Sequence, residues 1–292
     1  MTNQVLKIMR PSHWPKNGFV LAGLIFGKKL SGSEGFPWES VCLALSAFVC
    51  FCLTSSAVYI LNDLVDRPAD RLHPEKCKRL IASGAISVKQ ASSVMLLCLA
   101  LALSWAAFVG KPLVGILILY FVLMILYSLF MKQVMILDCI VISLGFCLRA
   151  VAGALAVQVD ISPWLVICTF ALCLFLGFGK RRSEIAQWPE NAHEFRKTLS
   201  GYTPELLAHM LNVTSALAIV SFLLYAMDED TKVRFGSHYL AYTTPLVLFC
   251  IFRFSALIQT GKYSGPVQFI WDDRPFQLGF LLWVTCCMLI IY

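Results

Sequence analysis

Nine long apolar stretches, separated by short polar segments, restrict this chain to a membrane-spanning fold. They lie at about 15–31, 39–61, 91–110, 113–131, 134–157, 164–179, 205–227, 239–258 and 276–292. Each is close to the roughly 20 apolar residues that a helix needs to cross a bilayer. Because lipid cannot satisfy exposed backbone N–H and C=O groups, these stretches are predicted to be helices. The sequence therefore predicts one all-α, polytopic membrane domain over residues 1–292, with nine transmembrane helices.

The composition supports a membrane protein. Of the 292 residues, 59% are hydrophobic and 14% are charged, whereas soluble domains average about 45–50% apolar and about 25% charged residues. The twelve cysteines lie mostly inside the apolar stretches and match no zinc-binding spacing. We interpret them as small apolar residues rather than as disulfide partners.

The positions of Lys and Arg predict the orientation of the helices. With the N-terminus in the cytoplasm, most of the 24 Lys and Arg residues fall in segments on the inside. The segments on the outside then contain only Lys28, Lys29, Lys111, Lys232 and Arg234. This bias follows the positive-inside rule, so the net charge of +7 requires no nucleic-acid partner.

Two polar segments on the predicted cytoplasmic side are longer than most of the other connections. They cover about 62–90 and 180–204, after the second and sixth apolar stretches. Long connections in compact proteins tend to be functional. We therefore expect a site at the cytoplasmic mouth of the helical bundle.

The first polar segment begins with the acidic motif NDLVDRPAD, residues 62–70. If the preceding helix continues, Asp63, Asp66 and Asp70 lie at i, i+3 and i+7, on one face. Carboxylates this close repel one another and favour a hard cation such as Mg²⁺, which binds few protein carboxylates together with substrate phosphates. The alternative is a solvated helix end whose acids lie next to bases.

Basic residues follow these acids closely. Arg71, Lys76 and Arg79 come within ten residues of the motif. Metal-binding acids beside cationic side chains are typical of a diphosphate site, because the cations take the phosphate charge that the metal leaves.

The second polar segment begins with a basic motif, GKRRSE at 179–184. Lys180, Arg181 and Glu184 can share one helix face. Anchoring at the inner membrane surface accounts equally well for the Lys-Arg-Arg run, but it does not require Glu184.

Arg149 is an ionisable residue deep in the fifth apolar stretch. Such groups are costly in a bilayer and mark functional sites by default. Two roles fit equally well: binding a phosphate at the floor of a cavity, or pairing with an acid to lock two helices together.

The pattern Asn62-Asp63-x-x-Asp66-x-x-x-Asp70 resembles the first signature of the UbiA superfamily of intramembrane prenyltransferases. The resemblance implies a nine-helix bundle whose aspartate-rich cytoplasmic mouth binds Mg²⁺ and a diphosphate. It covers essentially the whole chain, since the apolar stretches and polar segments agree in position. Ordinary members carry a second Asp-x-x-x-Asp motif after the sixth helix, where this chain has Lys180-Arg181-Arg182-Ser183-Glu184.

One branch of the superfamily, the decaprenyl-phosphate phosphoribosyltransferases, is more similar. The similar segments are RPSHWPKN at 10–17, Arg71-x-His73-Pro74, IASG at 81–84, Leu137-Asp138 to Leu148-Arg149, Gly179-Lys180-Arg181 with Glu184, Arg196-Lys197-x-Leu199-x-x-Tyr202, and Asp273-Arg274. Leu80 departs from the branch, where Pro is expected. Members of this branch move a phosphoribosyl group from 5-phosphoribosyl 1-diphosphate to a polyprenyl phosphate, which yields a precursor of arabinofuranosyl donors for cell-envelope glycans.

The resemblance implies a set of site residues and partners. Asp63, Asp66 and Asp70 would bind Mg²⁺, with Mn²⁺ as the alternative ion, and Asn62 would orient a ligand or the ribose. The expected substrate-binding residues are Lys16, Arg71, Lys76, Arg79, Lys180, Arg181, Glu184, Tyr202 and Arg149. The expected partners are 5-phosphoribosyl 1-diphosphate, a polyprenyl phosphate and the bilayer of a bacterial inner membrane, with a homo-oligomer such as a trimer.

Two other functions remain open. The first is a prenyltransferase of the same superfamily, which moves a prenyl group from a prenyl diphosphate to an aromatic acceptor. The missing second Asp-x-x-x-Asp motif counts against it. The second is a transporter for an anionic metabolite, whose charged site would lie near the membrane midplane. Polar residues gathered at one mouth do not favour a path through the membrane.

Overall fold

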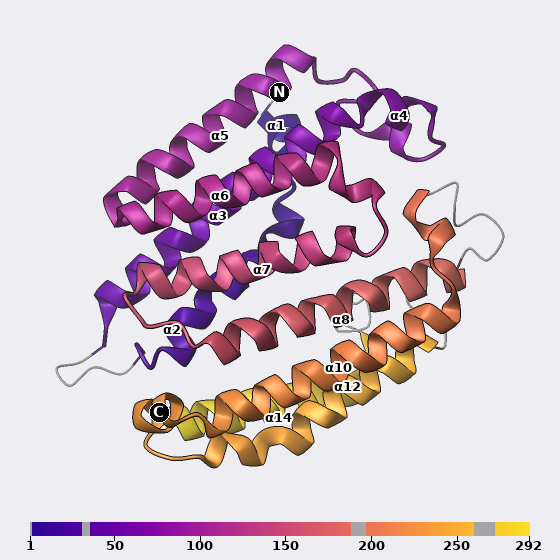
Figure 1. The fold of residues 1–292 in the computed structure, drawn as a ribbon. Coiled ribbons are helices and arrows are strands. Elements are labelled where there is room, and N and C mark those ends of the chain that lie inside the picture. Colours follow the sequence, from indigo (N-terminus) through magenta and orange to yellow (C-terminus); the bar gives the residue numbers. More distant parts are fainter. Residues whose placement is uncertain (1, 31–35, 188–196, 260–271) are drawn as a thin grey trace. The chain divides into compact units, whose positions relative to one another are not determined.

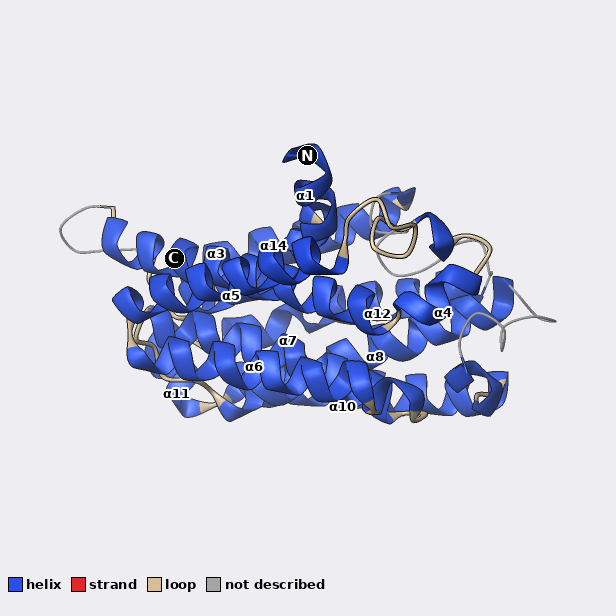
Figure 2. Cartoon of the chain, turned by 90° about the horizontal axis from the view of Figure 1, so that it is seen from above, coloured by secondary structure: helices blue, strands red, loops and turns tan. Residues whose placement is uncertain are grey.

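The computed structural model describes residues 2–30, 36–187, 197–259 and 272–292. Within these ranges every regular element is a helix, as Figures 1 and 2 show. The chain forms two compact units. Unit 1 comprises Met1–Lys132 and Leu148–Asp160, and unit 2 comprises Gln133–Cys147 and Ile161–Tyr292.

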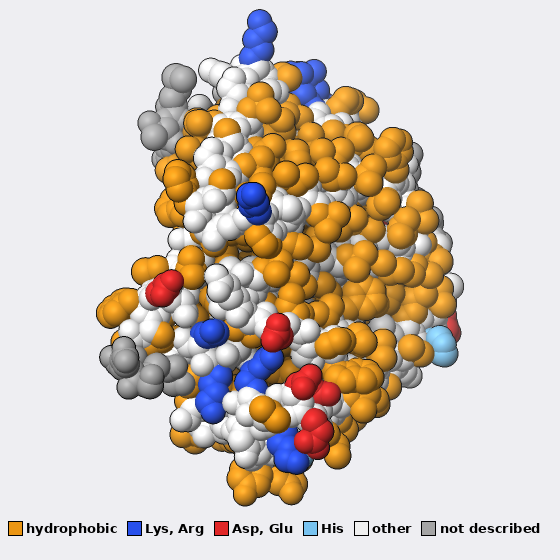
Figure 3. Space-filling view, turned by 60° about the vertical axis from the view of Figure 1, so that its left-hand side comes forward, with side chains coloured by type: hydrophobic (Ala, Val, Ile, Leu, Met, Phe, Trp, Pro, Cys, Tyr) orange, Lys and Arg blue, Asp and Glu red, His pale blue; other side chains and the backbone are white. Residues whose placement is uncertain are grey.

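Among the described residues, eight helical stretches are long and apolar enough to cross a membrane. They are α3 (Trp38–Val65), α5 (Val88–Val109), α6 (Lys111–Leu129), α7 (Leu137–Ala156), α8 (Pro163–Gln187), α10 (Pro204–Met227), the stretch Tyr239–Gln259 formed by η5 and α12, and α14 (Arg274–Ile291). Each overlaps one predicted apolar stretch, so the predicted polytopic all-α class is confirmed. On the face drawn in Figure 3, apolar side chains cover much of the surface, and most of the charged side chains lie in the lower part of the view, with further Lys or Arg side chains above them.

The first predicted stretch, 15–31, does not form one continuous α-helix. Pro11–Leu21 is a 3₁₀-helix, η1, and Ala22–Phe26 is a short α-helix, α2. Pro15 lies inside η1, where it supplies no N–H donor and where its ring disfavours α-helical packing. The prediction of nine long helices is therefore corrected at this stretch, and a ninth membrane crossing stays a prediction.

Unit 1 is organised around α3. This helix packs against α5, α6, η1 and the N-terminal helix α1 (Thr2–Met9). A close backbone approach joins η1 and α2 to the second half of α7. A Cβ atom built on Gly153 would lie 1.7 Å from the carbonyl oxygen of Val20, and one built on Gly23 would lie 2.4 Å from the nitrogen of Ala154. Only glycine fits at these contacts, which fix the position of η1.

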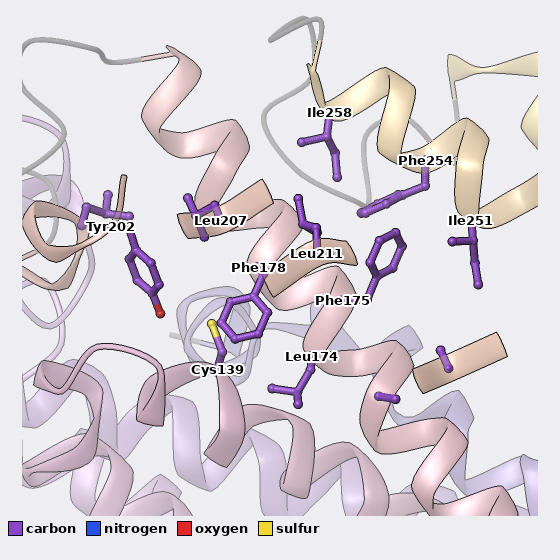
Figure 4. Packing of buried hydrophobic residues seen from close by; sticks show 13 residues of the cluster. Cys139, Leu174, Phe175, Phe178, Tyr202, Leu207, Leu211, Ile251, Phe254 and Ile258 are labelled. Carbon is purple, nitrogen blue, oxygen red and sulfur yellow. The ribbon is translucent and has the colours of Figure 1, made fainter. Parts of the chain in front are cut away.

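Unit 2 is organised around α8, which packs against α10 and against α12 (Thr244–Gln259). Figure 4 shows the apolar cluster of this unit, in which the rings of Phe175 and Phe254 lie 4.9 Å apart. An ion pair joins α12 to the start of α14, with Arg253 Nη2 2.7 Å from Asp273 Oδ2. Asp273 also caps α14, because its Oδ1 accepts from the backbone N–H of Phe276 at 2.9 Å.

The two predicted polar segments contain short helices. The segment 62–90 includes α4 (Arg67–Leu72) and η2 (Lys76–Lys78), and it ends in a capping box formed by Ser87 and Gln90 at the start of α5. The segment 180–204 begins within α8, which continues to Gln187, and it includes η4 (Lys197–Gly201). The remaining short elements are η3 (Met131–Gln133), α11 (Glu229–Phe235) and η5 (Tyr239–Thr243).

Candidate active site

The acidic motif lies where α3 ends and α4 begins, in unit 1. The backbone keeps a helical course through the break, because Asp66 N–H donates to the Asn62 carbonyl at 2.9 Å and Asp70 N–H donates to the Asp66 carbonyl at 2.8 Å. Pro68 lies in the first turn of α4, where its missing N–H has no helical partner to lose. The motif therefore lies on the end of the long helix α3 and on the short helix α4.

Asp63 and Asp70 are buried and face the same arginine. Nη1 of Arg79 lies 3.1 Å from Asp63 Oδ1 and 2.8 Å from Asp70 Oδ2. Nη2 of Arg10 donates to both carboxylate oxygens of Asp63, at 2.6 and 2.7 Å. Arg10 also lies over the ring of Tyr59, 5.3 Å from its centroid. Two carboxylates and two guanidinium groups thus form a compact, charge-balanced cluster.

Asp66 takes part in a separate group of contacts. Its Oδ2 accepts from Asn62 Nδ2 at 2.9 Å, and its Oδ1 pairs with the ammonium of Lys132. The three aspartates therefore do not meet at one point, and their predicted joint role stays a prediction. Among the residues that the structure describes, no three His, Cys, Asp or Glu side chains form a group that could hold a metal ion.

The residues of unit 1 nevertheless fit a magnesium ion through Asp63 and Asp70. Both carboxylates converge on a single cationic nitrogen of Arg79. Mg²⁺ is commonly held by one or two protein carboxylates, with water and substrate phosphate completing its octahedral coordination. The predicted three-aspartate metal site stays a prediction, and Asp66 would have to release Lys132 to join Asp63 and Asp70 in it.

The basic residues after the acids have mixed environments. Arg71 donates through Nε to the carbonyl of Ala82 at 3.1 Å, and the side chain of Arg67 donates likewise to Ile81 at 3.3 Å. These bonds hold the segment between η2 and α5 against α4. Lys76 is half-buried and lies in η2. Lys16 is exposed in η1, with Nζ 3.3 Å from His13 Nδ1.

The basic motif lies on the last turns of α8, in unit 2. Lys180 is exposed, with Nζ 3.8 Å from Glu184 Oε1. Arg181, in contrast, is buried. Its Nη1 lies 2.6 Å from Glu184 Oε2, and its Nη2 lies 3.1 Å from the buried Asp138 Oδ2. The two neighbouring cations thus have opposite environments.

Tyr202 completes this buried group. Its hydroxyl oxygen accepts from the backbone N–H of Ile136 at 2.8 Å, and its O–H donates to Asp138 Oδ1 at 3.3 Å. Figure 4 shows its ring directed toward Phe178 and Cys139. Burial, together with the nearby Asp138 carboxylate, raises the pKa of the Tyr202 phenol well above its usual range, so the hydroxyl stays protonated.

The predicted substrate-binding roles of Arg181 and Tyr202 stay predictions, and this geometry adds a structural role for both side chains. Both were expected to bind substrate, but their polar atoms face buried partners inside unit 2. Removing a guanidinium that pairs with a buried carboxylate is strongly destabilising, so Arg181 contributes to the stability of unit 2. Lys180 is exposed, and Arg182, whose Nη1 donates to the Pro204 carbonyl at 2.6 Å, is half-buried.

Arg149 lies in a buried polar network of unit 1. Its Nε donates to Asn17 Oδ1 and its Nη2 donates to the Tyr120 hydroxyl, both at 2.8 Å. The guanidinium also lies 4.7 Å from the ring centroid of Tyr120. Asn17 in turn donates to Ser55 Oγ at 3.1 Å. These contacts join η1, α3, α6 and α7. They differ from both predicted roles of Arg149, which were phosphate binding and pairing with an acid.

Sequence reasoning missed two partners of the acidic motif. Arg10 and Lys132 are 53 and 66 positions from Asp63 and Asp66, respectively. Arg10 belongs to the RPSHWPKN segment quoted above, but its spacing gives no indication of a contact with Asp63. Lys132 follows an apolar helix, where positive-inside anchoring explains it fully.

An all-helical membrane fold with acids in the pattern NDxxDxxxD at the end of a spanning helix defines a class of intramembrane transferases. The chain belongs to the UbiA prenyltransferase family, whose family model matches residues 20–281. The predicted resemblance to this family is therefore confirmed.

Relatives within the family narrow this class to the branch expected from the motifs. The chain is 31% identical to the decaprenyl-phosphate phosphoribosyltransferase of Corynebacterium glutamicum, over 100% of this chain and 88% of that protein. It is 30% identical to the protein of the same name from Mycolicibacterium smegmatis, over 100% of this chain and 93% of that protein. The similarity to this branch thus runs along the whole chain.

Solved structures confirm the fold. A UbiA homologue from Archaeoglobus fulgidus bound to GPP and Mg²⁺ matches with a TM-score of 0.71 and 20% identity, covering 99% of both chains. A UbiA homologue from Aeropyrum pernix K1 matches with a TM-score of 0.62 and 16% identity, covering 96% of both chains.

Proposed function

We propose that this protein transfers the 5-phosphoribosyl group of 5-phosphoribosyl 1-diphosphate to a polyprenyl phosphate and releases diphosphate. The main support is the similarity to decaprenyl-phosphate phosphoribosyltransferases along the whole chain. The product, a lipid-linked phosphoribose, would serve as a precursor of arabinofuranosyl donors for cell-envelope glycans. The soluble substrate would enter from the cytoplasm of a bacterial cell, at the inner membrane.

The acid–arginine cluster of unit 1 suits the diphosphate of the donor. Asp63 and Asp70 would hold Mg²⁺, which supplies positive charge to the leaving diphosphate when it is bound. Arg10 and Arg79 lie on the same carboxylates and would take further phosphate charge. Lys16, Arg71 and Lys76 are the other cations of unit 1 that we assign to the donor phosphates. Asn62 would keep Asp66 in place through the hydrogen bond between them.

The reaction forms one bond and breaks one. A phosphate oxygen of the lipid acceptor attacks the anomeric carbon of the ribose, and the bond from that carbon to the diphosphate oxygen breaks. Positive charge develops at the anomeric carbon, as in other glycosyl transfers. Because the acceptor phosphate is already an anion at neutral pH, no side chain has to remove a proton from it.

The basic motif of unit 2 favours two phosphorylated substrates over a prenyl diphosphate and an aromatic acceptor. Where ordinary family members carry a second acidic pair, this chain presents Lys180, half-exposed beside Glu184. A second acidic pair would suit a second metal ion on a prenyl diphosphate, whereas an exposed ammonium suits a metal-free phosphate. We assign Lys180 to the 5-phosphate or to the acceptor phosphate.

Transfer of labelled phosphoribose tests this function. The purified protein would be incubated in detergent with radiolabelled 5-phosphoribosyl 1-diphosphate, a polyprenyl phosphate and Mg²⁺. The expected result is a labelled lipid that is absent with a chelator and in Asp63→Ala, with Glu75→Gln as the matched control for loss of an acid in the same segment. Prenyl transfer to an aromatic acceptor, with no labelled lipid from folded protein, would contradict the proposal. Anion uptake by proteoliposomes without either product would indicate a transporter.

A further inference from the structure

The two acids that would hold the metal are already neutralised by arginines. Nη1 of Arg79 is within hydrogen-bonding distance of both Asp63 and Asp70, at 3.1 and 2.8 Å. Arg10 binds both oxygens of Asp63. A positive nitrogen therefore stands where the two carboxylates converge, and a divalent cation that arrives alone has to displace it.

The partners in this cluster differ in burial. The side chains of Asp63 and Asp70 are 7% and 6% exposed, whereas that of Arg79 is 32% exposed. The side chain of Arg10 is 24% exposed. Leaving a buried carboxylate without a cation is strongly unfavourable, so the acids need a positive charge at all times. The arginines are long and reach solvent, so they are the groups that can move.

We propose that Arg10 and Arg79 exchange partners when substrate binds. In the empty site they neutralise Asp63 and Asp70, and in the loaded site they turn to the phosphate oxygens of a metal-bound diphosphate. Charge is balanced in both states: the divalent cation replaces two guanidinium groups on the two carboxylates, and those groups balance two charges of the diphosphate. This proposal rests on the proposed function only in taking a diphosphate as the ligand.

The exchange makes binding of cation and diphosphate interdependent. A cation alone would displace the arginines and leave two guanidinium groups without an anion, so it would bind weakly. A diphosphate alone would take the arginines away from two buried carboxylates, which is also unfavourable. With both bound, neither the carboxylates nor the guanidinium groups lack a partner of opposite charge, so cation and diphosphate bind as a pair.

Neighbouring arginines provide a matched control. Arg67 lies in the same segment, but its side chain donates to the backbone carbonyl of Ile81 at 3.3 Å rather than to an acid. Removing Arg67 takes away one nearby positive charge without freeing a carboxylate. Arg67→Gln therefore separates a general electrostatic effect from release of Asp63 and Asp70.

Binding of Mn²⁺, measured by electron paramagnetic resonance on the full chain in detergent, tests the exchange without any reaction. Inorganic pyrophosphate serves as the diphosphate probe. Wild-type protein should bind Mn²⁺ weakly alone and at least about tenfold more tightly with pyrophosphate. Arg79→Gln should bind Mn²⁺ alone at least about tenfold more tightly than wild type, and it should lose most of the gain from pyrophosphate. The scale comes from proton binding, because an adjacent cation changes the affinity of a carboxylate for a proton by about one to three powers of ten. Arg10→Gln should change in the same direction, and it serves as the second variant if Arg79→Gln does not fold.

Two results would overturn the exchange. One is that neither Arg79→Gln nor Arg10→Gln binds Mn²⁺ alone more tightly than wild type. The other is that Arg67→Gln gives the same gain as Arg79→Gln. Arg79→Lys, which keeps the charge, should resemble wild type in the absence of pyrophosphate. Failure of phosphoribosyl transfer with an intact exchange would point to a different diphosphate donor and would count against the proposed function alone.

Discussion

The guanidinium of Arg181 binds the fully buried carboxylate of Asp138, with Nη2 3.1 Å from Oδ2. This pair joins the end of α8 to the first turn of α7 inside unit 2. The same guanidinium holds Glu184 at 2.6 Å, so Glu184 is fixed on the face of α8 that also presents Lys180. We therefore propose that Arg181 positions Glu184 and that Lys180 binds the phosphate.

Replacing Arg181 should mainly lower stability, whereas replacing its neighbour Lys180 should mainly weaken substrate binding. Arg181→Ala leaves Asp138 buried without its cation and should lower the free energy of unfolding by about 3–5 kcal/mol. Lys180→Ala removes an exposed side chain and should change the free energy of unfolding by less than about 0.5 kcal/mol. It should raise the KM of a phosphorylated substrate. Denaturation in detergent and steady-state kinetics provide the two readouts. A stable Arg181→Ala protein with a raised KM would show that the guanidinium binds substrate after all.

Tyr202→Phe should affect stability rather than substrate binding. The substitution keeps the ring beside Phe178 but leaves the Ile136 N–H and Asp138 without the hydroxyl, at a cost of about 1–3 kcal/mol. Because the raised pKa keeps the phenol protonated, wild-type activity should show no titration of Tyr202 up to its ordinary value. Thermal unfolding and a pH profile of wild type and variant test this. A raised KM without a loss of stability would instead restore Tyr202 to the substrate site.

The glycine contact between η1 and α7 should tolerate no side chain. Gly153→Ala places a methyl group 1.7 Å from the Val20 carbonyl oxygen, and overpacking of this kind costs about 1–3 kcal/mol or more. Gly115→Ala in α6 is the matched control, since nothing lies within 4 Å of its Cβ. The control should be neutral or stabilising by up to about 1 kcal/mol. Equal stabilities of the two variants, measured by denaturation, would mean that η1 does not pack against α7 as described.

The Arg149 network should behave as a structural unit. Arg149→Met removes the donors to Asn17 and Tyr120, whereas Tyr120→Phe removes only one partner. A double-mutant cycle of the two should give a coupling energy of about 0.5–3 kcal/mol in the free energy of unfolding. Additive effects on stability, combined with weaker binding of a phosphate ligand by Arg149→Met, would favour the phosphate-binding alternative.

The three acids of the motif should contribute differently to phosphoribosyl transfer and to Mn²⁺ binding. Asp63→Asn and Asp70→Asn remove carboxylates that converge on Arg79, and each should reduce phosphoribosyl transfer by about 10²–10³-fold, the scale of losing one electrostatic contact to a leaving group. Both should also weaken Mn²⁺ binding in the presence of pyrophosphate. Lys132→Gln frees Asp66 and should strengthen Mn²⁺ binding if Asp66 joins the metal site. Unchanged Mn²⁺ binding in Lys132→Gln would assign Asp66 a role through Asn62 alone.

The sequence by itself determined the class of protein and the positions of its motifs. Apolar length decides where a chain crosses a bilayer, because unpaired backbone is not tolerated in lipid, and this holds for each stretch independently. The sequence also predicts that the three acids share one helical face, because residue spacing alone decides which side chains of a helix lie on the same side. The first stretch was the exception, because Pro15 within a polar context favours a 3₁₀-helix over a long α-helix.

Only the tertiary structure decided which charged side chains form ion pairs with each other. Helical periodicity says which residues of one element share a face, but it carries no information about the side chains that other elements bring to that face. Arg10 reaches Asp63 because glycine contacts hold η1 in unit 1, and Arg181 turns inward because Asp138 lies buried beside α8. Adjacent cations such as Lys180 and Arg181 look alike in sequence, and packing alone makes one of them solvent-facing and the other a buried ion-pair partner.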